Sequence, residues 1–418
     1  MLILYNFAIR LYYLYILTGS LLNRKARLWI QGRKGLLNRI NREVQSGNPL
    51  IWFHCSSLGE FEQGRPVMEA MKTMNPETRI LLTFYSPSGY EVRKKYQCAD
   101  FVYYLPLDTK RNASQFIRIV RPSAAYFVKY DFWYHYINQL HYAKIPVFLI
   151  SAIFRKSQIF FKRYGTWYRS VLGKFTHIYI QDEQSLELLS NIGLSNISVA
   201  GDTRFDRVLS ISGNVQQVKN LDLFRRNSFI IVAGSTWPED DKYLLGHINL
   251  NLEGIKYILV PHEIHDAHIS WLERNISRKV TRFSEMNENN ASETEVLIVD
   301  AVGYLSSLYQ YAGIAYIGGG FGKGIHNTLE AATFGIPVIF GPNYLKFREA
   351  KDLITEGAAF SIDGETSLLH VISDLLKDRD LLKRAGNSAR NYVEKNAGAT
   401  ARILKMGYLN SWGTNSDK

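Results

Sequence analysis

The sequence predicts an α/β protein with two domains, each built on a parallel sheet that helices cover on both faces. From Pro49 onward, short apolar runs alternate with amphipathic segments. The same alternation begins again after a polar stretch at residues 202–227. A chain of 418 residues with 46% hydrophobic content is also long enough to bury two cores. Alternating strands and helices of this kind are typical of parallel sheets.

Residues 1–34 are predicted to associate with a membrane. Leu2 to Leu22 is apolar and aromatic, and about 20 such residues can span a bilayer. Arg10 lies in its middle and would cost about 2.5–3.5 kcal/mol at the bilayer centre. A basic flank follows: Arg24, Lys25, Arg27, Arg33 and Lys34. The segment could span with this flank in the cytoplasm, lie in the interface as an amphipathic helix, or pack on the protein, and the sequence leaves spanning open.

The first domain is predicted over residues 35–215. Its predicted strands are 50–54, 80–84, 101–104, 124–128, 146–150, 177–181 and 197–200. The helices between them are predicted at 65–74, 89–96, 112–120, 133–142 and 184–192.

The second domain is predicted over residues 216–395, with strands at 229–233, 257–261, 295–299, 314–317 and 338–340. Three last helices are expected at 367–378, 380–395 and 400–409, and residues 396–418 are expected to cross back to the first domain. Two such domains in tandem form a cleft. Ligands of open parallel sheets bind beyond the carboxyl ends of the strands, so we examine the loops at those ends.

The most distinctive loop follows the strand that ends at Ile317. It places Gly318, Gly319, Gly320, Gly322 and Gly324 within seven residues. Glycine allows backbone to approach a ligand closely, and a helix predicted from Asn327 would offer unpaired N–H groups to phosphate. His326 and Glu330 would share one helical face, and Glu330 could accept hydrogen bonds from ribose. The alternative is a glycine-rich turn in which Glu330 only compensates the helix dipole.

Three loops of the first domain carry candidate groups. Glu60 follows the first strand beside a Gly turn, which suits a general base, although a surface carboxylate near a helix start would look the same. The loop after the second strand contains Ser86, Ser88 and Gly89 and is a candidate anion site. Lys129 and Asp131 follow the fourth strand, with Lys129 expected on the cleft rim.

Two loops of the second domain carry further candidates. Ser235 and Thr236 place two hydroxyls between a strand and a helix. Pro261 and His262 end the next strand, where a histidine facing the glycine loop could contact phosphate.

Charge and cysteine content restrict the partners. A net charge of +12 and a pI near 9.4 imply an anionic partner: a phosphorylated substrate, an anionic membrane or nucleic acid. No Lys/Arg block or zinc-type spacing favours nucleic acid, which ranks last and is not expected as a partner. Cys55 and Cys98 form no disulfide framework and are expected to be reduced, intracellular thiols.

Taken together, the loops resemble one family, the 3-deoxy-D-manno-octulosonic acid (Kdo) transferases of lipopolysaccharide synthesis. The most specific segments are 57–60 (SLGE, similar to S-V-G-E), 86–89 (SPSG, similar to T-P-T-G), 234–236 (GST, as in the family) and 324–330 (GIHNTLE, similar to G-G-H-N-P-L-E). Segments 201–206 (GDTRFD, like G-N-x-K-F-D) and 300–305 (DAVGYL, like D-T-M-G-E-L) support them. The resemblance covers nearly the whole chain.

Several positions depart from the family pattern. Lys129 and Asp131 replace the glutamates of E-x-E-L-W-P. The family's P-R-H becomes Pro261-His262-Glu263, without arginine, and the Glu of G-E-L becomes Tyr304. Ile325 replaces the second glycine of G-G-H, and Thr328 replaces the proline that follows in that motif. We interpret these departures as marks of a divergent branch.

The resemblance implies a GT-B glycosyltransferase fold, with two Rossmann-like domains facing a cleft. It implies that Kdo moves from CMP-Kdo to a hydroxymethyl oxygen of the lipid A precursor, lipid IVA, with inversion and Glu60 as base. The donor-binding residues would be Ser235, Thr236, Pro261, His262, Gly303, Gly319, Gly320, Gly322, Gly324, His326, Asn327 and Glu330. The acceptor-binding residues would be Ser57, Gly59, Ser86, Ser88, Gly89, Lys129, Asp131, Arg155 and Arg163. No metal or cofactor other than the donor is implied, and the enzyme would work at the cytoplasmic face of the inner membrane.

Three other functions remain open at this stage. The chain could be a membrane-associated GT-B enzyme that uses another nucleotide sugar, a sugar-nucleotide epimerase, or a non-enzymatic nucleotide-binding protein, because fold does not fix function. The sequence does not determine the number of Kdo units added, the acyl pattern accepted or the oligomeric state.

Overall fold

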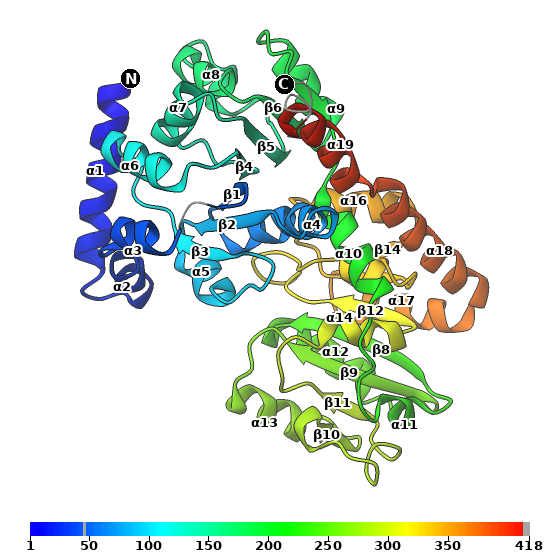
Figure 1. The fold of residues 1–418 in the computed structure, drawn as a ribbon. Helices are drawn as coiled ribbons and strands as arrows, with labels where there is room; N and C mark the ends of the chain where they lie inside the picture. The colour runs from blue at the N-terminus through cyan, green and yellow to red at the C-terminus, as the bar shows by residue number, and fades with distance from the viewer. Residues whose placement is uncertain (45–46, 413–418) are drawn as a thin grey trace. The chain divides into compact units, whose positions relative to one another are not determined.

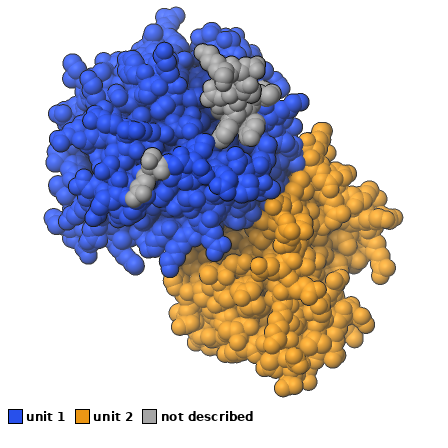
Figure 2. Space-filling view, in the orientation of Figure 1, with its two compact units in different colours: residues 1–207, 397–418 blue, residues 208–396 orange. Residues whose placement is uncertain are grey.

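The computed structural model describes residues 1–44 and 47–412, with side chains through Lys405, and divides into two compact units (Figures 1 and 2). Unit 1 comprises residues 1–207 and 397–418, and unit 2 comprises residues 208–396. The predicted boundaries followed residues 215 and 395. The first division falls inside a continuous helix, α10 (Thr203–Gly213), so no break in the sequence pattern marks it.

Unit 1 contains a seven-stranded parallel sheet in the order β3-β2-β1-β4-β5-β6-β7. The strands are β1 (Leu50–Cys55), β2 (Arg79–Phe84), β3 (Phe101–Tyr104), β4 (Ala124–Val128), β5 (Val147–Ala152), β6 (His177–Ile180) and β7 (Ile197–Val199). The strand order reverses between β1 and β4, where parallel sheets characteristically bind their ligands.

Helices cover both faces of this sheet. They are α4 (Leu58–Met74), α5 (Pro87–Arg93), α6 (Lys110–Val120), α7 (Tyr134–Tyr142), α8 (Thr166–Leu172) and α9 (Glu183–Ser190), with a 3-10 turn at Ile159–Phe161. Neighbouring residues of one strand pack into different hydrophobic cores, one on each face of the sheet. Trp52 packs on one face with Phe127, and Phe53 packs on the other with Tyr126. Side chains alternate across a strand, so a strand buried on both faces reads as a continuous apolar run.

Unit 2 contains a second seven-stranded parallel sheet, in the order β10-β11-β9-β8-β12-β13-β14. Its strands are β8 (Phe229–Thr236), β9 (Ile255–Pro261), β10 (Val280–Arg282), β11 (Val296–Ile298), β12 (Ile314–Ile317), β13 (Val338–Phe340) and β14 (Ala359–Ser361). Its helices are α11 (Leu221–Arg225), α12 (Pro238–Ile248), α13 (Asp266–Asn275), α14 (Leu305–Leu308), α15 (Leu329–Ala332), α16 (Arg348–Thr355), α17 (Glu365–Lys377) and α18 (Arg379–Asn396), with 3-10 turns at Phe283–Glu285 and Tyr309–Tyr311. Here the order reverses between β8 and β12.

The N-terminal segment forms three helices, α1 (Leu2–Gly19), α2 (Arg24–Gln31) and α3 (Leu36–Glu43). Figure 1 shows α1, in dark blue, along one edge of unit 1. Its length and composition would allow it to cross a membrane, and none of its residues is fully buried. It nevertheless contacts unit 1 through polar groups, because the Tyr5 hydroxyl donates to Asp108 and Asn6 Oδ1 lies 2.7 Å from His135 Nε2.

Arg33 does not belong to an exposed basic flank. It donates hydrogen bonds to the carbonyl oxygens of Leu105, Trp29 and Tyr85 at 2.8, 3.1 and 2.8 Å. Its guanidinium carbon also lies 3.8 Å from the centre of a Trp29 ring. Burial lowers the pKa of Arg33 to about 10. The side chain therefore fastens the N-terminal helices to the backbone that follows β2 and β3.

The last described helix, α19 (Ala399–Trp412), belongs to unit 1. The Asp206 carboxylate accepts hydrogen bonds from the Gly398 amide and from the amide and hydroxyl of Thr400, the last two at 2.7 and 2.8 Å. Ile403 and Leu404 share a core with α4. The outgoing and returning segments of the chain are thus bonded to each other within unit 1.

Candidate functional site

Three loops at the carboxyl edge of the unit 1 sheet are hydrogen-bonded to one another. The Ser86 amide, after β2, donates to the Ser56 carbonyl, after β1, at 2.8 Å. The Ser56 amide donates to Asp131, after β4, at 3.1 Å. The structure therefore brings together the predicted residues Ser57, Gly59, Glu60, Ser86 and Asp131.

Glu60 lies in the first turn of α4. The sequence pattern predicted a helix only from Arg65, but α4 begins at Leu58. A carboxylate at this position is stabilised by the positive end of the helix. Ser57 donates its hydroxyl to Glu60 Oε2, and the Glu60 side chain is half-buried. Glu60 is thus held in place yet accessible, as a general base must be.

Asp131 is almost fully buried and is bonded to the backbone and hydroxyl of Ser56. Burial raises the pKa of Asp131 well above its usual range, and the nearby charge of Glu60 raises it further, while the Ser56 bonds oppose this. The two carboxylates therefore lie in different environments, which is how proteins assign different proton-transfer roles to similar groups.

His54 lies beneath these carboxylates as a neutral imidazole. Burial lowers the pKa of His54 to about 3. The Trp133 indole N–H, which can only donate, approaches His54 Nε2 at 2.9 Å. His54 Nε2 is therefore the acceptor, and Nδ1 carries the proton toward Thr83 Oγ1 at 2.9 Å. The 3.6 Å separation between His54 Nε2 and Asp131 is consequently not an ion pair.

The remaining acceptor-site predictions differ in exposure. Ser86 and Ser88 hydroxyls lie 2.8 Å apart at the start of α5, and Gly89 is buried against the Phe84 ring. Lys129 has a positive φ of 64° and lies over the Tyr130 ring. Arg155, after β5, and Arg163, after the 3-10 turn, are both exposed.

Two apolar grooves open between α1 and these loops. One, of about 560 Å³, is lined by Tyr12, Ile16 and Trp29 and reaches Ser86 and Pro87. The other, of about 310 Å³, is lined mainly by aromatic rings: Tyr5, Tyr130, Phe132, Tyr134, Phe160, Trp167 and Tyr168. Both grooves therefore connect the N-terminal helix with the edge that contains Glu60.

In unit 2, the loops after β8, β9 and β12 are joined by backbone hydrogen bonds. The Gly318 amide donates to the Gly234 carbonyl at 2.9 Å, and the His262 amide donates to the Thr236 carbonyl at 2.9 Å. The His326 amide donates to the Gly318 carbonyl at 3.1 Å. Ser235 has a positive φ of 54°, and the Thr236 hydroxyl is buried without a partner among the residues that the structure describes.

Three rings form a cluster beside the glycine loop. The ring centres of His262 and His326 lie 4.2 Å apart, and that of Trp237 lies 4.7 Å from His262 and 6.5 Å from His326. The Trp237 indole N–H donates to His326 Nε2 at 3.0 Å. Burial lowers the pKa of His326 to about 4, with a smaller contribution from His262. His326 is therefore neutral near pH 7.

Asp240, which the sequence analysis did not identify, anchors the glycine loop. Its carboxylate accepts from the Gly319 amide at 2.8 Å, the Trp237 amide at 2.9 Å and the Tyr316 hydroxyl at 2.8 Å. Asp240 is fully buried, which raises its pKa. Its sequence position, in the first turn of a helix after a candidate loop, was the only signal available.

The glycine loop is closely packed where it leaves β12. A Cβ at Gly318 would lie 2.2 Å from the Ser235 carbonyl oxygen, and Gly319 has a φ of 90°. Both positions therefore require glycine. Gly320 packs on the backbone of Gly341, Gly324 follows near Phe347, and Gly322 is exposed. Gly303, between β11 and α14, is exposed and has open space around it.

The prediction that His326 and Glu330 share a helical face was wrong. The helix α15 begins only at Leu329 and has four residues, so His326 precedes it. Residues 324–326 instead run beside the end of β12, with Ile325 buried. Glu330 accepts from Asn327 Nδ2 and from Ser306, both at 3.0 Å. Ser306, on α14, gave no sequence signal. Because α15 has only a single turn, its N-terminus cannot serve as the phosphate site that the sequence predicted.

Comparison with known proteins identifies related chains. Residues 30–207 match the family model described as 3-deoxy-D-manno-octulosonic-acid transferase (kdotransferase). The 3-deoxy-D-manno-octulosonic acid transferase of Aquifex aeolicus is 30% identical over 80% of this chain and 88% of its own. The enzyme of the same name from Haemophilus influenzae is 26% identical over 85% and 86%.

Solved structures show the same fold at low sequence identity. A UDP-GlcNAc 2-epimerase from Neisseria meningitidis aligns with a TM-score of 0.60 and 15% identity, over 86% of this chain and 99% of its own. MurG from Acinetobacter baumannii aligns with a TM-score of 0.53 and 12% identity, over 86% and 99%. These likenesses and the two parallel sheets confirm the predicted GT-B class.

Proposed function

This chain belongs to the 3-deoxy-D-manno-octulosonic acid (Kdo) transferase family, glycosyltransferases of lipopolysaccharide synthesis, and from that premise we propose that it moves Kdo from CMP-Kdo to the lipid A precursor, lipid IVA. The observation that supports this most is Glu60, held by Ser57 in the first turn of α4 at the point where the unit 1 sheet reverses its order.

In the proposed reaction, Glu60 is the general base. Its carboxylate takes the proton of the acceptor hydroxyl as that oxygen attacks the anomeric carbon of Kdo, and the bond from that carbon to the CMP phosphate oxygen breaks. Ser57 orients the carboxylate, and the almost fully buried Asp131 fixes the loop from below. CMP leaves with the electron pair, so donors around the phosphate stabilise developing negative charge.

The donor would be held in unit 2. Ser235, Thr236 and His262 lie at neighbouring strand ends beside the glycine loop of Gly319, Gly320, Gly322 and Gly324, and would contact phosphate and Kdo. Glu330 and Asn327, bonded to each other, would hold the nucleotide ribose. Pro261, Gly303 and His326 would complete the donor site through shape complementarity to the donor.

The acceptor would be held in unit 1. The hydroxyls of Ser86 and Ser88 and the cations Lys129, Arg155 and Arg163 would contact its sugar phosphates. The two apolar grooves beside α1 would receive acyl chains, because they extend from the N-terminal helix to the loop of Ser86 and to Tyr130. This arrangement supports a transfer reaction at the membrane surface, and we assign that reaction to the cytoplasmic face of the inner membrane.

The decisive experiment incubates the purified protein with CMP-Kdo and lipid IVA and analyses the lipid by mass spectrometry. A product heavier by one Kdo residue or more is expected, and its mass counts the additions. No product from a protein that CMP still stabilises thermally would indicate another acceptor or sugar. Stabilisation by UDP but not CMP would support another nucleotide-sugar enzyme instead.

A further inference from the structure

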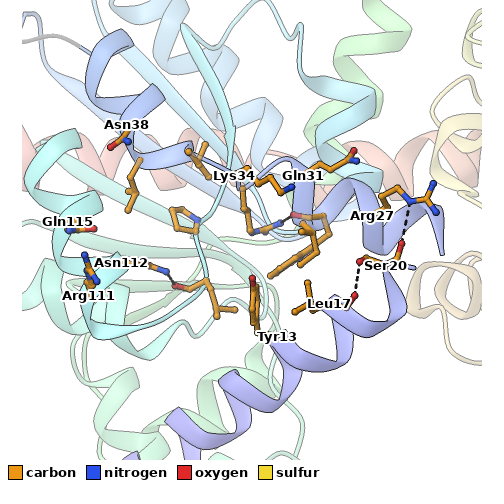
Figure 3. Close-up of a pocket in the computed structure, with 18 of the residues that line it drawn as sticks. Tyr13, Leu17, Ser20, Arg27, Gln31, Lys34, Asn38, Arg111, Asn112 and Gln115 are labelled. Atoms are coloured by element: carbon orange, nitrogen blue, oxygen red, sulfur yellow. Dashed lines mark hydrogen bonds between the residues drawn. The ribbon is translucent and has the colours of Figure 1, made fainter. Parts of the chain in front are cut away.

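Unit 1 contains a larger cavity that the proposed reaction does not use. It has a volume of about 930 Å³ and lies among α1, α2, α3 and α6 (Figure 3). None of the predicted catalytic, acceptor-binding or donor-binding residues lines it. Trp29 lines both this cavity and the groove that reaches Ser86.

Apolar side chains line the cavity along α1, and its cationic side chains come from other segments. Tyr13, Leu17 and Leu21 come from α1 and its end, and Leu17 and Leu21 are exposed by 40% and 77%. Figure 3 shows Tyr13 and Leu17 on α1, and Arg111 and Gln115 on another helix, α6. The lining therefore offers hydrocarbon contacts along α1 and polar contacts away from it.

The polar side is cationic. Lys34 and Arg111 are exposed, and neither makes an ion pair among the described residues. Arg27 also lines the cavity, and the lining contains no Asp or Glu. Around it, residues 1–42 contain eight Lys or Arg and no acidic residue.

The dipole of α6 adds to this positive potential. The first turn of α6 contains Lys110 and Arg111 without any acidic residue. Cations at the positive end of a helix are unfavourable, and a bound anion relieves that repulsion. A ligand that joins an anionic head to an apolar chain would match both sides of the cavity.

We propose that this cavity binds an anionic phospholipid of the bilayer, with its phosphate at Lys34 and Arg111 and a chain along Tyr13 and Leu17. The ligand is a lipid of the membrane and not the acceptor, because the acceptor edge opens into a different groove. Such a site would hold α1 at an anionic surface while the reaction proceeds elsewhere. The inference does not depend on the proposed reaction.

The test titrates the full-length protein with dihexanoyl-phosphatidylglycerol below its micelle concentration, using calorimetry. Saturable binding of one molecule is expected, with dihexanoyl-phosphatidylcholine and glycerol phosphate binding much more weakly. In Lys34→Gln and Arg111→Gln the affinity should fall about fivefold each, the usual contribution of a cation to anionic lipid binding. Leu17→Gln should also weaken binding of the lipid.

Matched variants separate a built site from general attraction. Arg24→Gln removes a cation from the same basic region outside the cavity, and Leu14→Gln changes an exposed leucine of α1 that does not line it. Both variants should bind dihexanoyl-phosphatidylglycerol with the affinity of the wild type. Equal losses in these controls, absence of saturable binding, or glycerol phosphate binding as tightly as the lipid would each overturn the proposal. Circular dichroism of every variant checks that α1 and unit 1 remain folded.

Discussion

At the scale of single residues, the contrast between Glu60 and Asp131 is the most informative feature. Both follow strands of one sheet and are linked through Ser56 and Ser57, yet only Asp131 is almost fully buried. Asp131 is committed to hydrogen bonds that hold the loop, while Glu60 remains accessible. Glu60 is therefore the residue to test, because its carboxylate is both accessible and held in place by Ser57.

Replacing Glu60 with Gln should keep CMP-Kdo binding and reduce transfer by about 10²–10⁴-fold, the usual contribution of general-base catalysis. The amide keeps the shape and can still bond Ser57, but it cannot accept the proton. Initial rates and CMP thermal shifts measure the two effects. Glu62→Gln, on the same helix, is the control, and near-normal turnover of Glu60→Gln would remove the assigned role.

Because of His54, the free energy of unfolding should depend on pH. Its pKa falls from 6.5 to about 3 on folding, so the stability it contributes is complete above pH 6.5 and is lost as the pH falls toward 3. The free energy of unfolding of the wild type, minus that of His54→Gln, should therefore shrink below pH 6.5, by roughly 1.4 kcal/mol per pH unit. Urea unfolding at several pH values measures this, with the exposed His265→Gln as control, and a constant difference would contradict it.

The sequence predicted Glu60, Ser235 and His262 as candidate site residues because each follows a predicted strand, and ligands bind at that edge of a parallel sheet. It missed Asp240 and Ser306, whose importance arises from contacts across distant segments: Asp240 meets Gly319, and Ser306 meets Glu330. No periodic pattern encodes such pairs. The short α15 shows a related limit, because residues 324–326 bond back to Gly318 and Gly319 and the helix begins only at Leu329.

At the scale of elements, the first turn of α4 offers a direct test of how closely the acceptor approaches. A Cβ at Gly59 would have only Ser57 Oγ nearby, at 3.8 Å, so Gly59→Ala should fold normally and gain up to about 1 kcal/mol of helix propensity. If the acceptor passes this turn, transfer should nevertheless fall at least tenfold. Initial rates and thermal unfolding measure both quantities.

Gly89→Ala is the contrasting variant for that experiment. Its Cβ would lie 2.4 Å from the buried Phe84 ring and should cost about 1–3 kcal/mol of stability by overpacking. If Gly59→Ala proved as unstable as Gly89→Ala, its loss of transfer would reflect folding and not acceptor contact.

Asp240→Ala should weaken nucleotide binding through the glycine loop. It leaves the Gly319 and Trp237 amides and the Tyr316 hydroxyl without their buried acceptor, at about 1–3 kcal/mol for each group. Unit 2 should unfold earlier and lose CMP binding, while hydrogen exchange in unit 1 stays unchanged. Asp374→Ala, on an exposed side chain of α17, is the control.

At the scale of the whole molecule, both sheets could be predicted because most of their strands are buried on two faces and appear as continuous apolar runs. The two strands that were missed, β10 and β14, have three residues each and lie at sheet edges. Edge strands contain polar residues such as Arg282 and Ser361, so their sequence resembles a loop.

Unit 2 is a continuous segment with its own sheet and core, so residues 208–396 should fold when produced alone. We expect cooperative thermal unfolding and CMP-dependent stabilisation of this fragment, measured by circular dichroism. Unit 1 has no such continuous segment, and residues 1–207 without α19 should unfold at a lower temperature than unit 1 in the full chain. A fragment 208–396 that lacks cooperative unfolding would contradict this division.

The return of the chain to unit 1 has a consequence for biosynthesis. During translation, all of unit 2 is synthesised before Ile403 and Leu404 of α19, which share a core with α4, the helix that positions Glu60. The Asp206 carboxylate likewise lacks its hydrogen-bond donors, Gly398 and Thr400, until those residues have been synthesised. The helix that supports the proposed base therefore completes its packing only after the whole of unit 2 has been synthesised, so a polypeptide that ends within residues 208–396 lacks the contacts of α19 with α4.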